Sequence, residues 1–200
     1  MTSLFIPLAT LCSQRRSVRT FADRPVPGDF IEKIEQIART SPYASGRKNW
    51  RLCYVSEPEK MAEMSALINE KTSLLVPNLR EDFREQFIDY AVSFSAFAKA
   101  PLLIIPVFKT FSTLSYMQRE SQPTLERWER DNYVKSISCV SMLILLAAES
   151  LGLGACLMTG PLIAEASLKP ALGLRESQEI GAIIPVGFPA EPSHEESYED

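Results

Sequence analysis

The feature that most limits the fold of this chain is a pair of nearly continuous apolar runs, residues 102–108 (LLIIPVF) and 181–188 (GAIIPVGF). Runs of this kind are typical of strands that are covered on both faces. Each run contains a proline, Pro106 or Pro185. Because proline cannot donate a ladder hydrogen bond, we expect an edge or a bulge near those two points.

Helical and strand patterns surround the two runs. The sequence predicts helices over residues 5–14 and 28–39, a helix that a Ser56–Glu59 capping box opens and that continues to about Asn69, and a buried helix over residues 133–151 that ends at Gly152 and Gly154. Residues 50–55 and 155–158 predict two further strands. The order has no regular βαβ rhythm, so we expect an α+β fold with three layers, α-β-α, rather than a doubly wound sheet.

Two segments are open to more than one interpretation. Residues 78–99 carry a long aromatic-rich stripe at helical spacing, which is typical of core or subunit interface, with direct ligand binding as the alternative. Residues 109–132 are polar with scattered aromatics. That composition fits a lid-like excursion, and it fits a plain surface helix around residues 125–130 equally well.

Size and charge indicate one domain over residues 1–200. The chain has 200 residues, 46% apolar and 23% charged, which is enough to build a substantial core. Its formal net charge of -4 gives no broad surface for nucleic acid, so an anion site would have to be built locally. Residues 189–200 form an acidic, proline-bearing tail that we expect to be loosely held.

Cysteine and histidine usage excludes a zinc site of the usual spacing. The four cysteines Cys12, Cys53, Cys139 and Cys156 form no C-x-x-C pair, and the single histidine, His194, lies in the acidic tail. Each cysteine has apolar neighbours in sequence, so we expect small buried thiols in a reduced, cytoplasmic protein.

The apolar stretches of the sequence do not have the form of targeting or membrane segments. No basic residue precedes the apolar residues 4–12, which argues against a signal peptide, because such a peptide carries its positive charge first. The longest apolar run, residues 139–148, is too short to span a membrane.

A basic cluster near the start of the chain is the clearest candidate for a binding site. Arg15, Arg16 and Arg19 surround Ser17 in the string RRSVRTF, and forked guanidinium groups beside a hydroxyl match a phosphate well. A solvated or ion-paired surface patch is the alternative. The sequence has no G-x-G-x-x-G after a strand, no P-loop, no G-x-S-x-G and no histidine placed for a triad, so hydrolysis through a nucleophile has no visible base.

Several strings in order resemble the nitroreductase family. They are RRSVRTF, then VP before an amphipathic helix, SPYASGRKNW, AKAPLLIIPV, AAESLGLGACLMTGP and IIPVGFPAE, which together span residues 15–191. The resemblance implies a three-layer sandwich of the nitroreductase type, with a mixed, mostly antiparallel sheet flanked by helices, in an intertwined homodimer. It also implies FMN at the subunit interface, NAD(P)H as electron donor, and small electron-poor acceptors such as nitroaromatics or quinones.

The resemblance assigns the site residue by residue. Arg15, Arg16, Ser17 and Arg19 would contact the FMN phosphate and ribityl chain, and the string 41–50 would reach the flavin of the partner subunit through Pro42, Tyr43, Ala44, Gly46 and Lys48. Met158, Thr159 and Gly160 would approach the ring nitrogen that accepts hydride, where a glycine permits close contact. Phe111 and Tyr116 of the lid candidate would cover the acceptor slot. The resemblance implies no catalytic side chain and no metal.

The sequence departs from the family pattern at two places. Tyr43, Gly46, Lys48 and Asn49 stand where serine, asparagine, glutamine and proline are usual. We hypothesise that Lys48 places a cation beside the pyrimidine edge and raises the flavin potential, with an exposed loop lysine as the alternative. The residues after Pro189 also lack the late arginine or lysine of many relatives, so FMN affinity would depend more on the first arginines.

Two other functions are compatible with the same residues. One is a flavin enzyme of this fold with different reductive chemistry, such as dehalogenation, ene reduction or flavin reduction. The other is a flavin-binding protein without catalysis. Turnover with a nicotinamide donor separates them.

Overall fold

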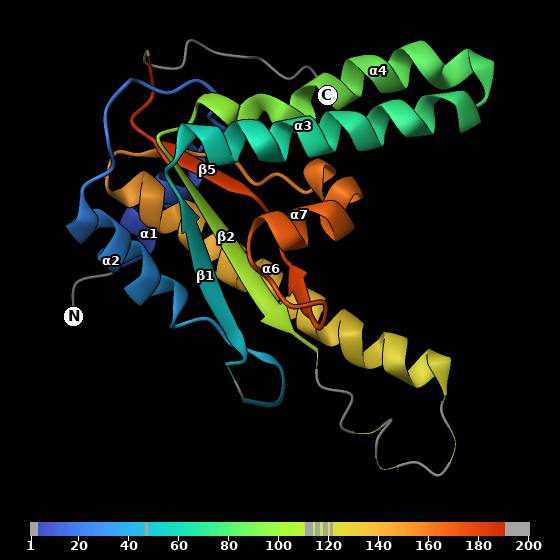
Figure 1. Cartoon of the computed structure of the whole chain (residues 1–200). Coiled ribbons are helices and arrows are strands. Elements are labelled where there is room, and N and C mark those ends of the chain that lie inside the picture. The colour runs from blue at the N-terminus through green and yellow to red at the C-terminus, as the bar shows by residue number, and fades with distance from the viewer. Residues whose placement is uncertain are drawn as a thin grey trace.

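The computed structural model describes residues 4–46, 48–110, 114, 117, 120 and 122–190. Its centre is a five-stranded sheet (Figure 1). The strands are β1 (Trp50–Val55), β2 (Leu102–Lys109), β3 (Gly154–Ala155), β4 (Gln178–Ile180) and β5 (Ile184–Gly187). They run in the order β1-β2-β5-β3, with β4 also paired to β2, and every pairing between them is antiparallel. One parallel bridge, Ser17 with Ala155, makes the sheet mixed, as expected.

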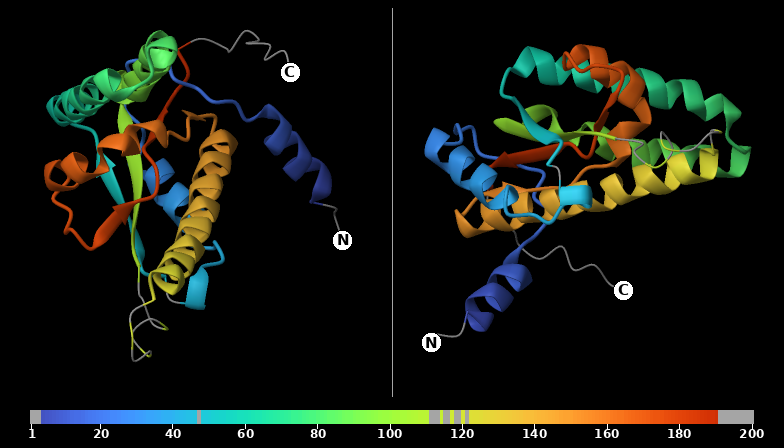
Figure 2. Two further views of the ribbon diagram at one scale, coloured as in Figure 1. Left: turned by 90° about the vertical axis from the view of Figure 1, so that its right-hand side faces the viewer. Right: turned by 90° about the horizontal axis from the view of Figure 1, so that it is seen from below.

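Strand β2 divides the core into two halves. Leu102, Ile104 and Phe108 belong to one apolar cluster, with α2 (Gly28–Ala38) and α6 (Pro123–Ser150). The intervening Leu103, Ile105 and Val107 belong to the other, with α3 (Pro58–Leu75), α4 (Arg84–Val92) and α7 (Glu165–Ala171). Each such side chain contributes about 1.5–3 kcal/mol when fully buried. The three layers predicted from the apolar runs are confirmed, and Figure 2 shows the sheet between the two groups of helices.

Pro106 lies at a bulge, as one of the two expected alternatives had it. Ile104 pairs with Ile184 of β5, and Val107 pairs with Ile180 of β4. Between these pairs, residues 105–106 of β2 lie opposite the three residues 181–183 that connect β4 to β5. Gly181 N donates to Pro106 O at 2.7 Å within this interruption. The proline therefore removes no regular ladder bond, although β2 is a central strand.

Pro185 lies within β5, between β2 and the short β3. Its carbonyl accepts from Cys156 N at 3.3 Å, but the proline nitrogen cannot return a bond. Regular pairing of β3 consequently ends at Ala155, where the sequence predicted a strand to residue 158. Met158 regains contact with the sheet through two bonds to Ile183, at 3.0 and 2.9 Å.

Helix α6 crosses one face of the sheet and ends in a well-formed cap. Gly152, at φ +71, donates to Glu149 O, and Leu153 donates to Ala148 O, which is the Schellman pattern. The helix begins at Pro123, so residues 125–130 are helical, as the second interpretation of that segment proposed. By length and composition α6 could cross a membrane, but it packs on α2 and β2 as a core helix, with 44% of its most apolar window buried.

Helices α3 and α4 form a hairpin that extends beyond the sheet (Figure 1). Helix α3 begins after Glu57, with no side-chain cap from Ser56, so the predicted capping box is wrong. The Glu57 carboxylate instead accepts from Ser56 N at 3.0 Å. The expected long stripe over residues 78–99 is broken into η3 (Glu81–Phe83), α4 and η4 (Ser93–Lys99). Its two aromatics in η4 are buried, whereas Phe83 is 49% exposed.

Helix α1 (Phe5–Gln14) stands away from the body of the molecule (Figure 2). None of its residues is buried in the single chain, and Leu4, Ile6 and Leu8 are 78%, 67% and 55% exposed. Two cysteines expected to be buried are exposed: Cys12, on this helix, and Cys139, on α6. Sequence neighbours alone misplaced them, because apolar neighbours along the chain do not fix which face of a helix a residue occupies.

Candidate functional site

The basic string lies along the edge of the sheet. Val18 N donates to Ala155 O at 3.1 Å, and Ala22 N donates to Phe188 O at 2.8 Å, so residues 15–22 run beside β3 and the end of β5. A Cβ on Gly154 would lie 2.6 Å from Val18 Cβ. The glycine therefore permits the close approach that fixes this segment. Arg16 and Arg19 are exposed along this segment, whereas Arg15 and Val18 are half-buried.

The arginines have no acidic partner among the residues that the structure describes. Arg16 Nη1 donates to Ser13 O and Arg15 O at 2.5 and 3.1 Å, which leaves its charge uncompensated. The ion pairs of the described chain involve neither Arg15 nor Arg19. Ser17 is exposed beside them. The cluster thus offers forked donors and positive charge to an anion, as the phosphate interpretation requires.

The loop 41–49 is docked on α6 of its own chain. Ala44 N donates to Ser136 Oγ at 3.0 Å, and the Tyr43 and Tyr133 rings lie 6.0 Å apart between centroids. Burial raises the pKa of the Tyr43 hydroxyl, and nearby Tyr133 and Glu179 add to the effect. Its oxygen is buried without a hydrogen-bond partner in the described part of the chain. Gly46 has φ +67, a conformation that favours glycine or asparagine.

Two further side chains close the base of this loop. Lys48 is exposed, and its ammonium donates to Arg39 O at the end of α2. Asn49 donates through Nδ2 to Lys109 O at the end of β2. The single chain therefore holds Lys48 against its own helix, and its role toward a cofactor stays a prediction.

The Met158–Gly160 turn leaves the sheet on the side of α3 and α4. Met158 is buried and bonded to Ile183, whereas Thr159 is exposed and precedes η5 (Gly160–Ala164). Leu162 N donates to Thr159 O at 3.0 Å and closes the first turn of η5. Gly160 was predicted to admit close approach of a ligand. In the structure its missing side chain makes room for the ring of Phe94.

The basic string and the loop 41–49 lie at opposite ends of the sheet. Ser17 bridges Ala155, and both Ala155 and Leu102 pair with Val186, so the basic string lies at the Leu102 end of β2. Asn49 precedes Trp50, which pairs with Phe108, so the loop lies at the other end of β2. Six residues of β2 separate these levels, which is about 20 Å at the usual rise per residue. Within one chain the two groups therefore do not meet. A single site that used both would need two copies of the chain.

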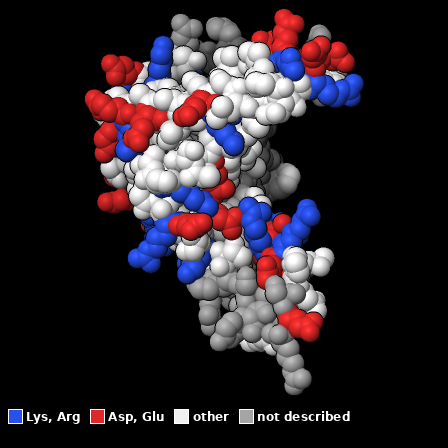
Figure 3. Space-filling view, turned by 45° about the vertical axis from the view of Figure 1, so that its right-hand side comes forward, with Lys and Arg blue, Asp and Glu red and all other residues white. Residues whose placement is uncertain are grey.

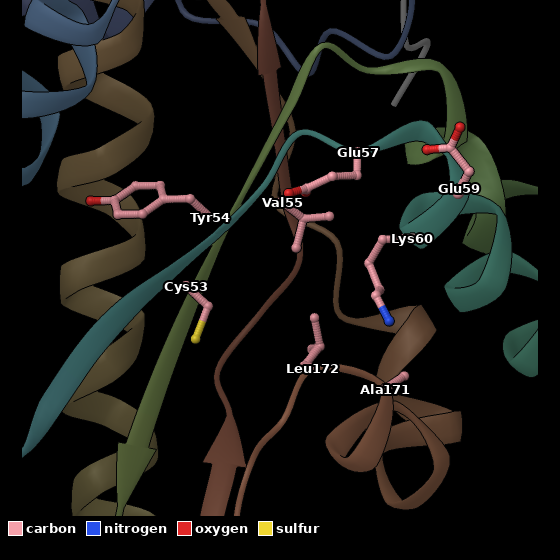
Figure 4. Close-up of a pocket in the computed structure, with 8 residues that line it drawn as sticks. All are labelled: Cys53, Tyr54, Val55, Glu57, Glu59, Lys60, Ala171 and Leu172. Atoms are coloured by element: carbon pink, nitrogen blue, oxygen red, sulfur yellow. The ribbon is translucent and has the colours of Figure 1, made fainter.

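One open cleft in the described part of the chain contains none of the predicted residues. It has a volume of about 470 Å³ and lies between β1, the start of α3 and the end of α7 (Figure 4). Figure 4 shows Tyr54 turned away from Lys60 and Leu172, toward α2, where its hydroxyl donates to Glu35. On the face seen in Figure 3, basic and acidic side chains are mixed. Neither observation indicates a complete site in one chain.

Comparison with known proteins decides the relationship. The model of the nitroreductase family matches residues 12–188. The chain belongs to the nitroreductase family. It is 24% identical to the NAD(P)H nitroreductase homologue YfhC of Bacillus subtilis (strain 168), over 92% of this chain and 85% of that protein. It is 27% identical to an iodotyrosine deiodinase of Nematostella vectensis, over 88% of this chain but only 65% of that protein's length.

Solved structures share the fold of this nitroreductase-family chain. A BluB-like flavoprotein from Clostridium difficile 630 has a TM-score of 0.83 at 21% identity and covers 96% of this chain, which covers 94% of that one. An iodotyrosine deiodinase bound to FMN and 3-iodo-L-tyrosine has a TM-score of 0.71 at 20% identity, with 96% and 95% covered. The predicted fold class is confirmed, and family membership places the chain among oxidoreductases.

The structure groups most of the predicted residues into three segments, of which the basic string and the loop lie at opposite ends of the sheet. These are the string with Arg15, Arg16, Ser17 and Arg19, the loop with Pro42, Tyr43, Ala44, Gly46 and Lys48, and the turn Met158, Thr159 and Gly160. Phe111 and Tyr116, the lid candidates, lie outside the described residues. Sequence reasoning missed the supporting residues Val18, Phe94 and Ser136. Val18 lies in the string RRSVRTF and Phe94 in the aromatic stripe, but neither pattern shows the supporting role, which is recognised only by what each residue packs against or bonds.

Proposed function

We propose that this chain is an FMN-dependent oxidoreductase that passes a hydride from NAD(P)H to small electron-poor acceptors such as nitroaromatics or quinones. The observation that carries the proposal is the uncompensated basic string beside β3, because it offers a phosphate site in a family whose solved members include FMN-bound proteins. Bound FMN would supply the redox chemistry itself.

The residues of the chain would bind and orient the cofactor. Arg15, Arg16 and Arg19 would hold the phosphate through charge-assisted hydrogen bonds, with Ser17 as a further donor. The Thr159–Gly160 turn would present backbone groups to the ring. No general base is required of the protein, which agrees with the lack of a catalytic dyad in the sequence. We propose a cytoplasmic location, on the basis of four cysteines that form no disulfide in the described chain.

We propose a homodimer with one cofactor site at each end of the interface. The separation of the basic string from the loop 41–49 supports this arrangement, because the partner's loop would complete each site. The exposed apolar side of α1 and the open side of α6, with Cys139 and Met142, supply a surface for the partner. Large apolar interfaces are usual in obligate dimers.

The first experiment is a visible spectrum of the purified protein, followed by titration with FMN. We expect flavin absorbance, or tight uptake of added FMN, and then turnover of NADH or NADPH with a nitroaromatic or a quinone. Protein that binds FMN without turnover would support a non-catalytic flavin-binding protein. Protein that stays colourless in excess FMN would exclude the proposal altogether.

Lys48 is proposed to act on the redox potential from the partner's loop. A cation near the pyrimidine edge favours the reduced, more negative ring, so Lys48→Gln should lower the flavin midpoint potential. Arg51→Gln, a few residues further along, serves as a control for the loss of a nearby charge. Equal potentials for Lys48→Gln and the unmodified protein would leave Lys48 as an exposed loop residue.

Reductive dehalogenation is a second candidate. It is favoured by the iodotyrosine deiodinases among the relatives, from Nematostella vectensis and Hydra vulgaris at 27% and 26% identity. Iodide release from 3-iodo-L-tyrosine by the chemically reduced protein tests it. Release that is fast relative to nitroaromatic reduction would favour dehalogenation, and no release would remove it.

A further inference from the structure

Gly160 is a glycine because of the space beside it rather than its backbone conformation. Its φ lies outside the positive range, so an alanine would be free of backbone strain. A Cβ at this position would lie 2.4 Å from Phe94 Cε1 and 2.6 Å from Phe94 Cδ1. Carbon atoms do not approach so closely, so the ring of Phe94 occupies the place of a side chain on Gly160.

Phe94 is itself firmly held. It is 4% exposed and belongs to the apolar cluster of α3, η4 and the Met158 turn. On the hairpin side, the Tyr90 ring meets the Phe94 ring edge-on, with centroids 4.9 Å apart and planes at 82°. This geometry is a favourable one for aromatic pairs. Tyr90 is 62% exposed, so the pair reaches from the surface of the α3–α4 hairpin to the turn.

The turn at Thr159 and Gly160 has one backbone hydrogen bond of its own near its start, and its next residue, Pro161, is buried. The backbone N–H and carbonyl of Met158 both bond to Ile183. Thr159, in contrast, is exposed, and the first hydrogen bond of η5 lies within the turn, where Leu162 N donates to Thr159 O. The contact of Phe94 with Gly160 is therefore a lateral restraint on a turn that leaves the sheet after Met158.

We propose that Phe94 is a positioning residue, which fixes the Thr159–Gly160 turn and so joins the α3–α4 hairpin to the part of the chain that faces the flavin. The inference rests on the proposed function for its redox consequence, and on the packing of Phe94 against Gly160 for its structural one. The two consequences are tested separately.

A double-mutant cycle between Gly160 and Phe94 tests the packing. Gly160→Ala should lower the midpoint of thermal unfolding, because the new methyl group must displace the ring. Phe94→Val removes the three ring atoms nearest to Gly160, so Gly160→Ala should cost much less in that background. Phe97→Val is the matched control, since Phe97 is a fully buried phenylalanine of the same η4. Additive shifts in both backgrounds would overturn the proposal.

Amide exchange in the protein without cofactor gives a local readout. Phe94→Val should speed exchange at Leu162 by about tenfold and leave Met158 unchanged, because only the turn loses its restraint. Phe97→Val should not single out Leu162. Should Phe94→Val fail to fold, Gly160→Ala alone must still speed exchange at Leu162. Equal effects of the two valine variants at Leu162 would reduce Phe94 to an ordinary core residue.

The redox consequence is measured on FMN-loaded protein. Phe94→Val should shift the flavin midpoint potential or the absorbance band, whereas Phe97→Val should leave both as in the unmodified protein. Local exchange effects with no change of potential would show that the turn is positioned by Phe94 but does not meet the flavin. A protein that takes up no FMN would refute the proposed function and leave the exchange result to stand alone.

Discussion

Three guanidinium groups within five residues carry an electrostatic cost in the free protein. Arg15, Arg16 and Arg19 repel one another, and among the described residues no carboxylate offsets them. Repulsion between exposed charges is moderate in water and is screened by salt. A bound dianion would remove the repulsion and add hydrogen bonds, so the segment is better suited to a liganded state than to an empty one.

Substitution at this cluster should weaken FMN binding. We expect Arg19→Gln to raise the dissociation constant about tenfold to a hundredfold, because a hydrogen bond to a charged group contributes about 1.5–3 kcal/mol. Arg80→Gln is the control, since Arg80 is an exposed arginine at the tip of the α3–α4 hairpin. Fluorescence titration measures both. Equal affinity for the two variants would mean that the string is only a solvated patch.

At single positions the sequence indicated which residues belong to the candidate site better than it indicated why each residue type is there. The basic string was recognisable because charge and order are written in the sequence. Gly160 was expected to admit a ligand, but the space beside it is occupied by the ring of Phe94, which lies 66 residues earlier in the chain. Tyr43 was placed in the site, whereas its packing on Tyr133 was not foreseeable. Long-range neighbours decide such positions, and no local pattern encodes them.

Helix ends offer a direct test at the next scale. Gly152→Ala should destabilise the fold by about 1 kcal/mol, because alanine pays for the left-handed conformation at φ +71. A Cβ there would meet nothing within 4 Å, so crowding does not contribute. Gly28→Ala at the start of α2 is the control, since it is equally open and has an ordinary φ. Urea unfolding should show a loss for Gly152→Ala alone.

Contact between β1 and α2 should make stability depend on pH in the acid range. Tyr54 Oη donates to Glu35 Oε2 at 2.7 Å, and this bond lowers the pKa of Glu35 below its ordinary value of 4.5. Burial opposes the shift, and the smaller effect of Arg39 adds to it. The unfolded chain therefore binds the proton first as the pH falls. The contribution is complete above pH 4.5 and is lost as the pH falls through the lower folded pKa.

The matching experiment compares Glu35→Gln with Glu32→Gln, an exposed glutamate on the same helix. Unfolding free energies are measured above and below pH 4.5. Glu35→Gln should reduce the loss of unfolding free energy between the two pH values by up to about 1 kcal/mol, given partial exposure and screening, and so flatten the acid-side slope. An unchanged slope would mean that the Tyr54–Glu35 bond does not survive in solution.

Elements with a strong local signal were predicted well. Helices α1 and α2 and strand β1 have the expected positions, because their periodicity and turn residues agree. The hairpin was the main failure, since one stripe of apolar spacing covered two 3₁₀ turns and a short helix. The capping box failed because Pro58 supplies the helix start itself. Spacing reports which face is apolar, but it does not report where the backbone breaks.

On the scale of the whole molecule, the open apolar surface predicts self-association. We expect a dimer of the 22.4 kDa chain by light scattering. Ile6→Glu combined with Leu8→Glu should shift it toward monomer, because both side chains are largely exposed in the single chain and would desolvate two charges in an interface. Ser167→Glu on α7, across the sheet from α6, should leave the dimer intact. A monomer for the unmodified protein would refute the two-chain site.

The opposite-end placement of the basic string and the loop 41–49 has a consequence for mixed assemblies. Consider one chain without Arg15 and Arg19, co-expressed with another whose loop 41–49 is altered. Each parent homodimer would carry two damaged centres. In the hybrid, both lesions would fall on one centre, and the other would be assembled from intact halves only. Complementation to about half of normal flavin content in isolated hybrids would follow from the proposed two-chain site.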